Sequence, residues 1–163
     1  NEYNIERQNI EKKILDEAIE KIEKEEKGKS CIIVGNTGWQ HGIIGIVSSK
    51  VTETYFKPSI LICFEGEEGK GSGRSIPGFD LHEALTKCGE HLERFGGHAM
   101  AVGVTVNKNE FESFKQELEE YAKSCEIDKI VPIINIDSEL SLKNVDIDSV
   151  KSCLLYTSDA ADD

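Results

Sequence analysis

The fold is determined by residues 31–64, which read CIIVGNTGWQHGIIGIVSSKVTETYFKPSILICF. The stretch begins with a short apolar run at 31–34 that is typical of a strand buried on both faces. Apolar residues then recur at helical spacing over 42–56, and after Pro58 a second apolar run at 60–64 predicts another strand. A strand, a helix and a strand joined in this way form a βαβ unit with parallel strands. The sequence therefore predicts an α/β fold.

Apolar periodicity also predicts elements on both sides of this unit. The expected helices cover residues 5–26, 80–92 and 109–124, and the expected strands cover 100–106 and 132–137. Gly28 ends the first of these helices, and Asp80 is a favourable N-cap for the second. No helix or strand is assigned to the glycine-rich stretch 66–78, and the segment 94–98 is expected to be a tight loop.

Composition and charge exclude several classes of protein. The 163 residues are 38% hydrophobic and 31% charged, with a mean hydropathy of -0.38, which is typical of a soluble globular protein. No apolar run approaches the roughly 20 residues that a membrane-spanning helix needs, and nothing in these residues suggests export, so we expect neither a membrane span nor secretion. The net charge of -12 disfavours a broad nucleic-acid-binding surface, so any anion site must be a local group of residues.

The cysteines indicate a reducing environment. Cys31, Cys63, Cys88, Cys125 and Cys153 are widely spaced and lie in apolar strand or helix patterns. This favours buried thiols over disulfides, and we expect a cytoplasmic protein. Neither CxxC nor HExxH occurs, so the sequence offers no support for a zinc site.

The turn after the first predicted strand is a candidate anion site. Residues 35–42, GNTGWQHG, precede the predicted helix, where free N–H groups and the helix dipole favour a phosphate. The Walker and GxGxxG patterns are both absent, which argues against binding of a nucleoside triphosphate. The alternative is an ordinary βα loop in which Trp39 caps the core.

A second candidate is the segment 71–75, GSGRS. The guanidinium of Arg74 suits a bidentate grip on a phosphate, and the hydroxyls of Ser72 and Ser75 suit additional hydrogen bonds. These residues would form a clamp for a terminal phosphate. The alternative is a flexible surface hairpin with a solvated arginine.

A third candidate is FGGH at residues 95–98, where paired glycines let the backbone approach a ligand and present the imidazole of His98. One histidine does not by itself specify a metal or a general acid. Solvated helix faces are the simpler interpretation of the remaining polar features, which are His82, His91 and the glutamate-rich stretches 23–26 and 117–120.

Taken in order, these motifs resemble the RecJ family of single-strand-specific 5′ to 3′ DNA exonucleases, in the DHH phosphoesterase superfamily. The matching stretches are GWQHGIIGIV at 38–47, GKGSGRSIPGFDL at 69–81 and RFGGHAMAVG at 94–103. The resemblance covers about residues 1–150.

The resemblance implies a division of the chain into four parts. A connecting helix is expected at 1–27, a DHH-associated domain with a mixed sheet flanked by helices at 28–127, and the first strand of a truncated OB-fold within 128–152. Residues 153–163 depart from the family and resemble translated sequencing adapter, which predicts a non-native tail. A divergent C-terminus is the alternative.

The resemblance also implies roles for individual residues. Ser72 and Arg74 match positions that hold the DNA 5′-phosphate, and Ser75 lies beside them. The implied cleft loops are formed by Trp39, His41, Gly42, Gly96, Gly97 and His98. His98 is an auxiliary catalytic candidate, and Gln40 stands where many family members carry histidine.

The implied function is the substrate-binding portion of a single-strand-specific exonuclease in DNA repair and recombination. It would present the 5′-phosphorylated end of single-stranded DNA to a DHH domain that holds Mn²⁺ or Mg²⁺ and would precede Asn1. We therefore expect no complete catalytic set, no bound metal and no activity in this chain alone. Further expected partners are the DHH and OB-fold domains in cis and a single-strand-binding protein, with no membrane.

Two alternatives remain at this point. A DHH-family phosphodiesterase acting on oligonucleotides or cyclic dinucleotides shares the associated domain, but usually has a longer glycine run before the histidine and no OB-fold. A noncatalytic nucleic-acid-binding module is the second alternative, which the acidic excess disfavours because a general strand-binding groove needs positive charge along its length.

Overall fold

The computed structural model describes residues 2–134, 136, 139, 141, 143 and 146–152. The chain divides into two compact units, Asn1–Val131 and Pro132–Asp163. In the second unit residues 147–152 are helical, and the N–H of Val150 donates to the carbonyl of Asp146. The functional interest lies in the first unit, which contains the sheet.

The helices of the first unit are α1 (Glu2–Lys21), α2 (His41–Tyr55), α3 (Leu81–Lys87) and α4 (Phe111–Ser124). The strands are β1 (Ile32–Thr37), β2 (Ser59–Glu65), β3 (Glu68–Arg74), β4 (Leu92–His98) and β5 (Ala101–Asn107). A π-helical turn at Ile22–Glu26 extends α1, and short 3-10 turns lie at Gly89–His91 and Ile127–Lys129.

The described strands form one sheet in the order β1-β2-β3-β5-β4. β1 and β2 are parallel and joined by α2, and the other neighbouring pairs are antiparallel. The predicted βαβ unit and mixed α/β sheet are therefore confirmed.

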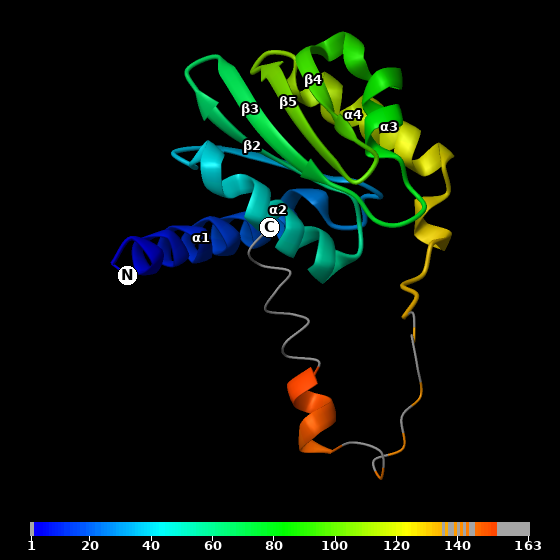
Figure 1. The fold of residues 1–163 in the computed structure, drawn as a ribbon. Helices are drawn as coiled ribbons and strands as arrows, with labels where there is room; N and C mark the ends of the chain where they lie inside the picture. The colour runs from blue at the N-terminus through cyan, green and yellow to red at the C-terminus, as the bar shows by residue number, and fades with distance from the viewer. Residues whose placement is uncertain are drawn as a thin grey trace. The chain divides into compact units, whose positions relative to one another are not determined.

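Helices cover the two faces of the sheet unequally (Figure 1). On one face α3 and α4 pack over the whole width of the sheet, and their core includes Ile33 of β1, Ile60 of β2 and Val104 of β5. On the other face α1 and α2 pack with buried residues of β1 and β2, such as Val34 and Leu61. The buried cluster under α1 and α2 contains no residue of β3, β4 or β5 among the described residues. Helix α2 reaches the near side of β3, where Gly45 lies against Ser72 and Arg74, and the rest of this face is left without a helical cover.

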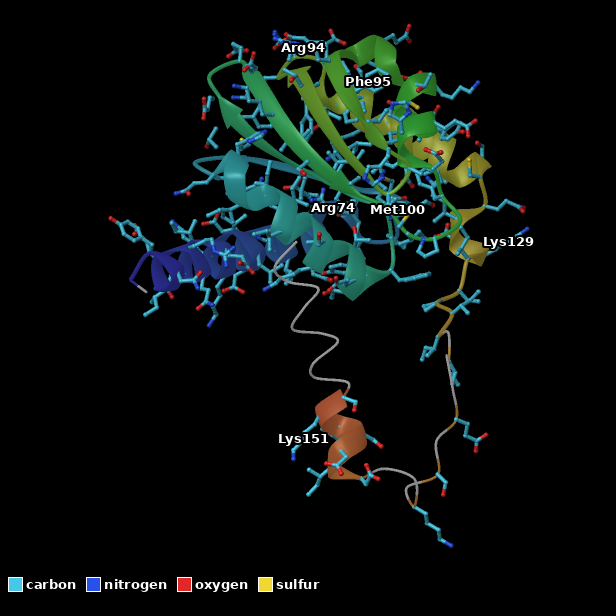
Figure 2. All side chains as sticks on the ribbon, in the orientation of Figure 1. Arg74, Arg94, Phe95, Met100, Lys129 and Lys151 are labelled. Carbon is cyan, nitrogen blue, oxygen red and sulfur yellow. The ribbon has the colours of Figure 1, made fainter. Side chains whose placement is uncertain are left out.

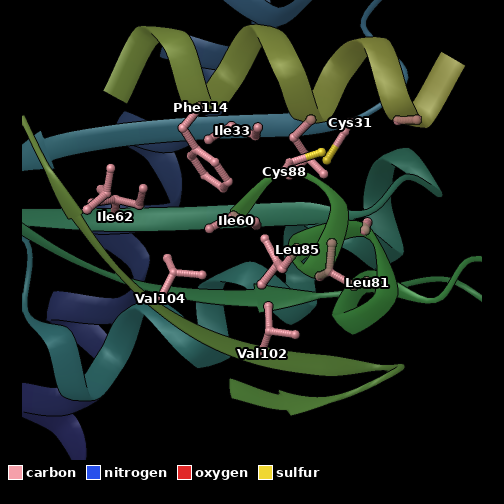
Figure 3. Close-up of a cluster of buried hydrophobic side chains, with 14 of the residues drawn as sticks. Cys31, Ile33, Ile60, Ile62, Leu81, Leu85, Cys88, Val102, Val104 and Phe114 are labelled. Atoms are coloured by element: carbon pink, nitrogen blue, oxygen red, sulfur yellow. The ribbon is translucent and has the colours of Figure 1, made fainter. Parts of the chain in front are cut away.

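The main core lies between the sheet and the helices α3 and α4 (Figure 3). Phe114, Leu81 and Leu85 point down from the helices onto β-branched side chains of the strands. Each such side chain contributes roughly 1.5–3 kcal/mol when fully buried. Cys31 and Cys88 lie in this core as free thiols whose side chains point toward each other in Figure 3.

The glycine-rich stretch, to which the sequence assigns no element, contains the middle strand of the sheet, β3. A Cβ on Gly71 would lie 2.5 Å from Val104 Cγ2 and 2.9 Å from Ile62 Cγ1, and a Cβ on Gly73 would lie 2.8 Å from Val102 Cγ2. The glycines therefore make room for branched side chains of the two neighbouring strands. Cross-strand packing overrides the low strand propensity of glycine.

The segment 94–98, which the sequence predicts to be a tight loop, belongs to the edge strand β4. The predicted helix 80–92 ends at Lys87 as α3, and β4 begins at Leu92 after the 3-10 turn. The predicted N-cap is confirmed, because the side chain of Asp80 accepts from the N–H of Glu83 at 2.9 Å.

The glutamate-rich stretches are not entirely solvated, contrary to expectation. Glu119 is buried because its carboxylate accepts hydrogen bonds from the backbone N–H groups of Ser30 and Cys31, each at 2.9 Å. Glu26 is buried and its Oε1 lies 2.7 Å from the Nζ of Lys115. These carboxylates attach the start of β1 and the end of the first helix to α4.

The two histidines predicted to be solvated are partly buried. His91 Nδ1 lies 2.8 Å from the carboxylate of Glu110, and the ring of His82 packs 5.9 Å from the ring of Phe95. Of the cysteines, Cys31, Cys63 and Cys88 are buried free thiols as predicted, whereas Cys125 is exposed. Cys153 lies outside the described residues.

The strand predicted from Pro132 is not formed by the described residues 132–134 and 136, and Ile133 and Ile134 are largely exposed. A strand needs a hydrogen-bonded neighbour, and the described part of the chain supplies none here. Residues 135, 137 and 153–163 lie outside the described residues, so the OB-fold start and the non-native tail stay predictions. None of the helices that the structure describes is long and apolar enough to cross a membrane.

Candidate phosphate-binding groove

The uncovered part of the sheet carries the candidate site. Side chains alternate along a strand, so Lys70, Ser72 and Arg74 of β3 point to the same face. The pairing of β4, β5 and β3 arranges this face in three cross-strand rows. The first row is His98, Ala101 and Arg74, the second is Gly96, Gly103 and Ser72, and the third is Arg94, Thr105 and Lys70. We call these nine residues the open face, because none of them is buried.

A groove runs over the open face beside α2. One cavity of about 440 Å³ is lined by residues of α2, β3 and β5, among them His41, Gly42, Gly45, Ser72, Arg74 and Gly103. A second cavity of about 220 Å³ shares His41 and Gly103 with the first and adds Lys70, Arg94 and Thr105. The shared lining makes the two cavities parts of one groove.

Arg74 is held in the groove by short-range contacts. Its Nη1 donates to the hydroxyl of Ser72 at 3.1 Å and to the carbonyl of Gly73 at 2.8 Å. A Cβ on Gly45 would lie 3.3 Å from Nη2, so the absence of a side chain on α2 gives the guanidinium its space. Both of these hydrogen bonds use Nη1, which leaves the Nη2 and Nε donors for a ligand.

The charge of Arg74 is uncompensated within the described residues. No carboxylate of this part of the chain lies within ion-pair distance of the guanidinium, although the protein has 31 acidic side chains against 19 basic ones. A partly buried arginine without a carboxylate partner is well suited to bind an anion. Arg74 is partly buried in strand β3, which favours the phosphate-clamp interpretation over the alternative of a flexible hairpin with a solvated arginine.

Ser75 lies outside the groove, contrary to the sequence prediction. It is buried, its hydroxyl donates to the carbonyl of Phe79 at 2.7 Å, and its N–H donates to the carbonyl of Met100 at 3.0 Å. Ser75 follows β3 and stabilises the turn that leads to α3. Ser72 and Arg74 are the two members of the predicted clamp that the structure brings together.

The N-terminus of α2 borders the same groove. His41 and Gly42 are the first residues of this helix and line the first cavity. The carbonyl of Gln40 accepts from the N–H groups of Ile43 and Ile44. The N–H groups of His41 and Gly42 have no intrahelical acceptor, so the positive end of the helix dipole lies beside Arg74.

Trp39, the third predicted residue of this loop, is in the core. It is 5% exposed, packs under α1 and α2, and donates from Nε1 to the carboxylate of Glu17 at 2.8 Å. The same carboxylate oxygen accepts from Asn36 Nδ2 at 3.3 Å. Trp39 therefore caps the core and positions the loop, as in the alternative interpretation, while His41 and Gly42 border the groove.

The two glycines of the Gly-Gly-His motif differ in their environment. Gly97 has a φ of +138° and a Cβ there would lie 2.2 Å from the carbonyl oxygen of Ala101, so only glycine fits. A Cβ on Gly96 would meet nothing within 4 Å. His98 is exposed on the open face, and its Nδ1 accepts from the N–H of Met100 at 3.3 Å, so this hydrogen bond does not use Nε2.

Several residues of the groove were not singled out from the sequence, among them Gly45, Lys70, Arg94, Gly103 and Thr105. A glycine inside a helix costs about 1 kcal/mol relative to alanine, which was the available signal for Gly45. The alternation of Lys70, Ser72 and Arg74 was the signal for a strand with one polar face. Lys70 Nζ lies 3.1 Å from Glu68, and this hydrogen bond raises the pKa of Lys70.

The described residues bring together one group of metal-ligating type, formed by Glu90, His91 and Glu117. It lies at the 3-10 turn and α4, on the core side of the sheet, and includes no residue of the groove. The groove therefore offers cationic and hydroxyl groups for an anion rather than ligands for a metal.

Comparison with known proteins adds a family to this geometry. Residues 28–124 match the model of the DHHA1 domain. The single-stranded-DNA-specific exonuclease RecJ of Bacillus subtilis is 34% identical over 152 residues, 91% of this chain and 19% of the relative. RecJ of Salmonella typhimurium is 33% identical over 123 residues, 70% of this chain and 21% of the relative.

A solved structure supports the same relationship. RecJ of Thermus thermophilus in complex with Mn²⁺ superposes with a TM-score of 0.66 at 29% identity, covering 74% of this chain and 18% of that one. The chain thus spans about a fifth of the length of the relatives that it matches.

Proposed function

The chain belongs to the DHHA1 domain family, in the form found in RecJ exonucleases, and on this premise we propose that it binds the 5′-phosphorylated end of single-stranded DNA. In the intact protein it would present that end to a metal-dependent DHH domain for hydrolysis, within DNA repair and recombination. Alone it would hydrolyse no DNA.

The observation that carries the proposal is the Arg74 guanidinium in the groove. It has free donors, no carboxylate partner among the described residues, the hydroxyl of Ser72 within 3.1 Å and the N-terminus of α2 beside it. A terminal phosphate carries more negative charge than an internal phosphodiester and offers more oxygens. This compact set of donors therefore favours the end of a strand.

The metal chemistry is proposed to lie outside this chain. RecJ of Thermus thermophilus has been solved with Mg²⁺ and with Mn²⁺. Such ions polarise a phosphodiester and activate water. The part of this chain would be to hold the strand end still, with the exposed Nε2 of His98 directed toward the strand as an auxiliary donor.

The proposal is tested by equilibrium binding of the 163-residue chain to short oligodeoxynucleotides with a 5′-phosphate or a 5′-hydroxyl. Arg74→Ala should weaken binding of the phosphorylated strand by about tenfold or more, since a charged hydrogen bond contributes roughly 1–3 kcal/mol. Binding of the 5′-hydroxyl strand should change much less.

The matched control is Lys87→Ala, which removes one positive charge from exposed α3 behind the sheet. An equal loss on both strands in Arg74→Ala would contradict recognition of the strand end and would favour a general nucleic-acid-binding module. Preference for a dinucleotide over every longer strand would favour the phosphodiesterase alternative.

A further inference from the structure

The groove continues beyond the phosphate clamp to a second group of donors. Arg94 of β4, Thr105 of β5 and Lys70 of β3 form one cross-strand row and line the second cavity. Figure 2 shows Arg94 at the opposite end of the strands from Arg74. Two cationic rows therefore border the groove at its two ends.

The row between them has almost no side chains. It consists of Ser72, Gly103 and Gly96. A Cβ on Gly96 would meet nothing within 4 Å, and a Cβ on Gly103 would meet only the carbonyl oxygen of Gly71 at 4.0 Å. Packing therefore does not require glycine at either position, although glycine weakens a strand. Gly103 lines both cavities and Gly96 pairs with it on the neighbouring strand, so this row is a floor of two glycines that begins in the groove and continues beside it.

The spacing of the rows fits more than one nucleotide. Lys70 and Arg74 are four residues apart on β3, which is about 13 Å along the strand. Arg94 lies on β4, two strands away from Lys70, which is about 10 Å across the sheet. Arg74 reaches toward the middle row, since its Nη1 lies 3.1 Å from the hydroxyl of Ser72, whereas Lys70 contacts Glu68 on the side away from that row. A single phosphate bound at Arg74 cannot also reach Arg94.

We propose that Arg94, assisted by Thr105 and Lys70, is a second phosphate subsite that binds an internal phosphodiester of the same single strand. The intervening sugar and base lie on the glycine floor formed by Gly96 and Gly103. This inference rests on the proposed function, because it takes the strand whose 5′-phosphate is held by Arg74 as its ligand.

The charges around Arg94 support an anion at this position. Arg94 is exposed and makes no ion pair with the described residues. Lys70 contacts Glu68, but both side chains are about half exposed, and such surface pairs contribute little. A phosphodiester oxygen can therefore replace Glu68 as the partner of Lys70 at small cost in free energy. The hydroxyl of Thr105 supplies a neutral donor.

The first experiment measures the gain in affinity with strand length. The 163-residue chain is titrated with 5′-phosphorylated thymidine and with 5′-phosphorylated oligothymidylates of two to four nucleotides. In the unsubstituted chain the longer strands should bind about tenfold more tightly than the mononucleotide. Arg94→Ala should remove most of this gain and affect the mononucleotide much less.

Salt dependence gives a second readout. Each phosphate neutralised on a single strand contributes about -0.7 to the slope of log K against log salt. The slope for the four-nucleotide strand should therefore be shallower by about 0.7 in Arg94→Ala than in the Lys87→Ala control.

The glycine floor is tested separately with Gly96→Val, which adds a side chain on the open face where space is available. The variant should fold, as checked by its circular dichroism and unfolding midpoint, and should bind the longer strands several-fold more weakly. Full affinity of a folded Gly96→Val for the longer strands would overturn the proposed floor.

The outcomes separate the two proposals. A mononucleotide that binds through Arg74, combined with a length gain that is absent or survives Arg94→Ala, overturns the second subsite and leaves the proposed function intact. A length gain that depends on Arg94 without any recognition of the 5′-phosphate overturns the clamp instead.

Discussion

The two faces of β3, β5 and β4 use the same residue type for opposite purposes. On the face toward α3 and α4, Gly71 and Gly73 lie beneath Val102 and Val104 of the neighbouring strand. On the open face, Gly96 and Gly103 have nothing above them. Glycine on the first face makes close packing possible, whereas glycine on the second leaves space for a ligand.

This contrast shows how a small acidic domain can gather several cations on one face. Helices α3 and α4 cover the apolar side chains of one face, while α1 and α2 stop above β2 and the near side of β3. The uncovered face then carries Arg74, Lys70 and Arg94, although the chain as a whole has a net charge of -12. Local placement of a few cations outweighs net charge at short range.

The largest effect expected is on Gly97, the neighbour of Gly96. An alanine at 97 would be strained at a φ of +138° and would place its Cβ 2.2 Å from the Ala101 carbonyl oxygen. Gly97→Ala should lower the free energy of unfolding by at least about 3 kcal/mol, whereas Gly96→Ala should change it by less than about 1 kcal/mol. Urea unfolding of both variants measures this difference, and similar losses would remove the distinction between the two faces.

The next effect concerns the thiol of Cys88 in the core face. Burial, followed by the nearby carboxylate of Glu117, raises the pKa of Cys88 from 9.0 to about 11. A raised pKa in the folded state contributes stability below pH 9 that is lost as the pH rises toward about 11. The free energy of unfolding should therefore fall over this range by up to about 2 kcal/mol.

The measurement is a series of urea unfolding curves between about pH 8 and pH 11.5. Cys88→Ala should make the fall between about pH 9 and 11 shallower than in the unsubstituted chain, while the raised pKa values of buried Cys31 and Cys63 keep part of the fall in both chains. Tyr121, whose pKa is raised to about 12 by burial and then by its hydrogen bond with Cys125, adds a later decrease in both the Cys88→Ala and the unsubstituted chain. An unchanged pH profile in Cys88→Ala would mean that this thiol is not protected by the core.

Much of the fold could be predicted from the sequence because its signals are local. The apolar runs 31–34 and 60–64 and the periodic segment between them led directly to β1, α2 and β2. The glycine-rich strand β3 and the edge strand β4 could not be recognised in this way. Their residues have low strand propensity, and what keeps them extended is the packing of Ile62, Val102 and Val104 from other strands.

Part of the candidate site could be predicted from the sequence because its signal is also local. Arg74 and Ser72 stand two residues apart in one motif, so the sequence alone is enough to pair them. Ser75 was included wrongly, because the strand ends at Arg74 and the next residue turns into the core. Arg94 and Gly103 join the groove only through strand pairing, which sequence spacing does not reveal.

The smallest effect expected is at Gly45, where the two roles of glycine meet in one residue. It lies inside α2, where alanine is favoured by up to about 1 kcal/mol, yet a Cβ there would lie 3.1 Å from Ser72 Oγ and 3.3 Å from Arg74 Nη2. The flexible guanidinium can yield, so Gly45→Ala should raise the free energy of unfolding by about 0.5–1 kcal/mol.

The displaced guanidinium should bind the 5′-phosphorylated strand a few-fold more weakly, in the titration used for Arg74. Gly42→Ala, whose Cβ meets nothing within 4 Å, is the control for the gain in helix propensity. A Gly45→Ala variant that gains stability and keeps full affinity would show that glycine is not needed at position 45. It would also show that phosphate binding does not depend on the position of Arg74 against α2.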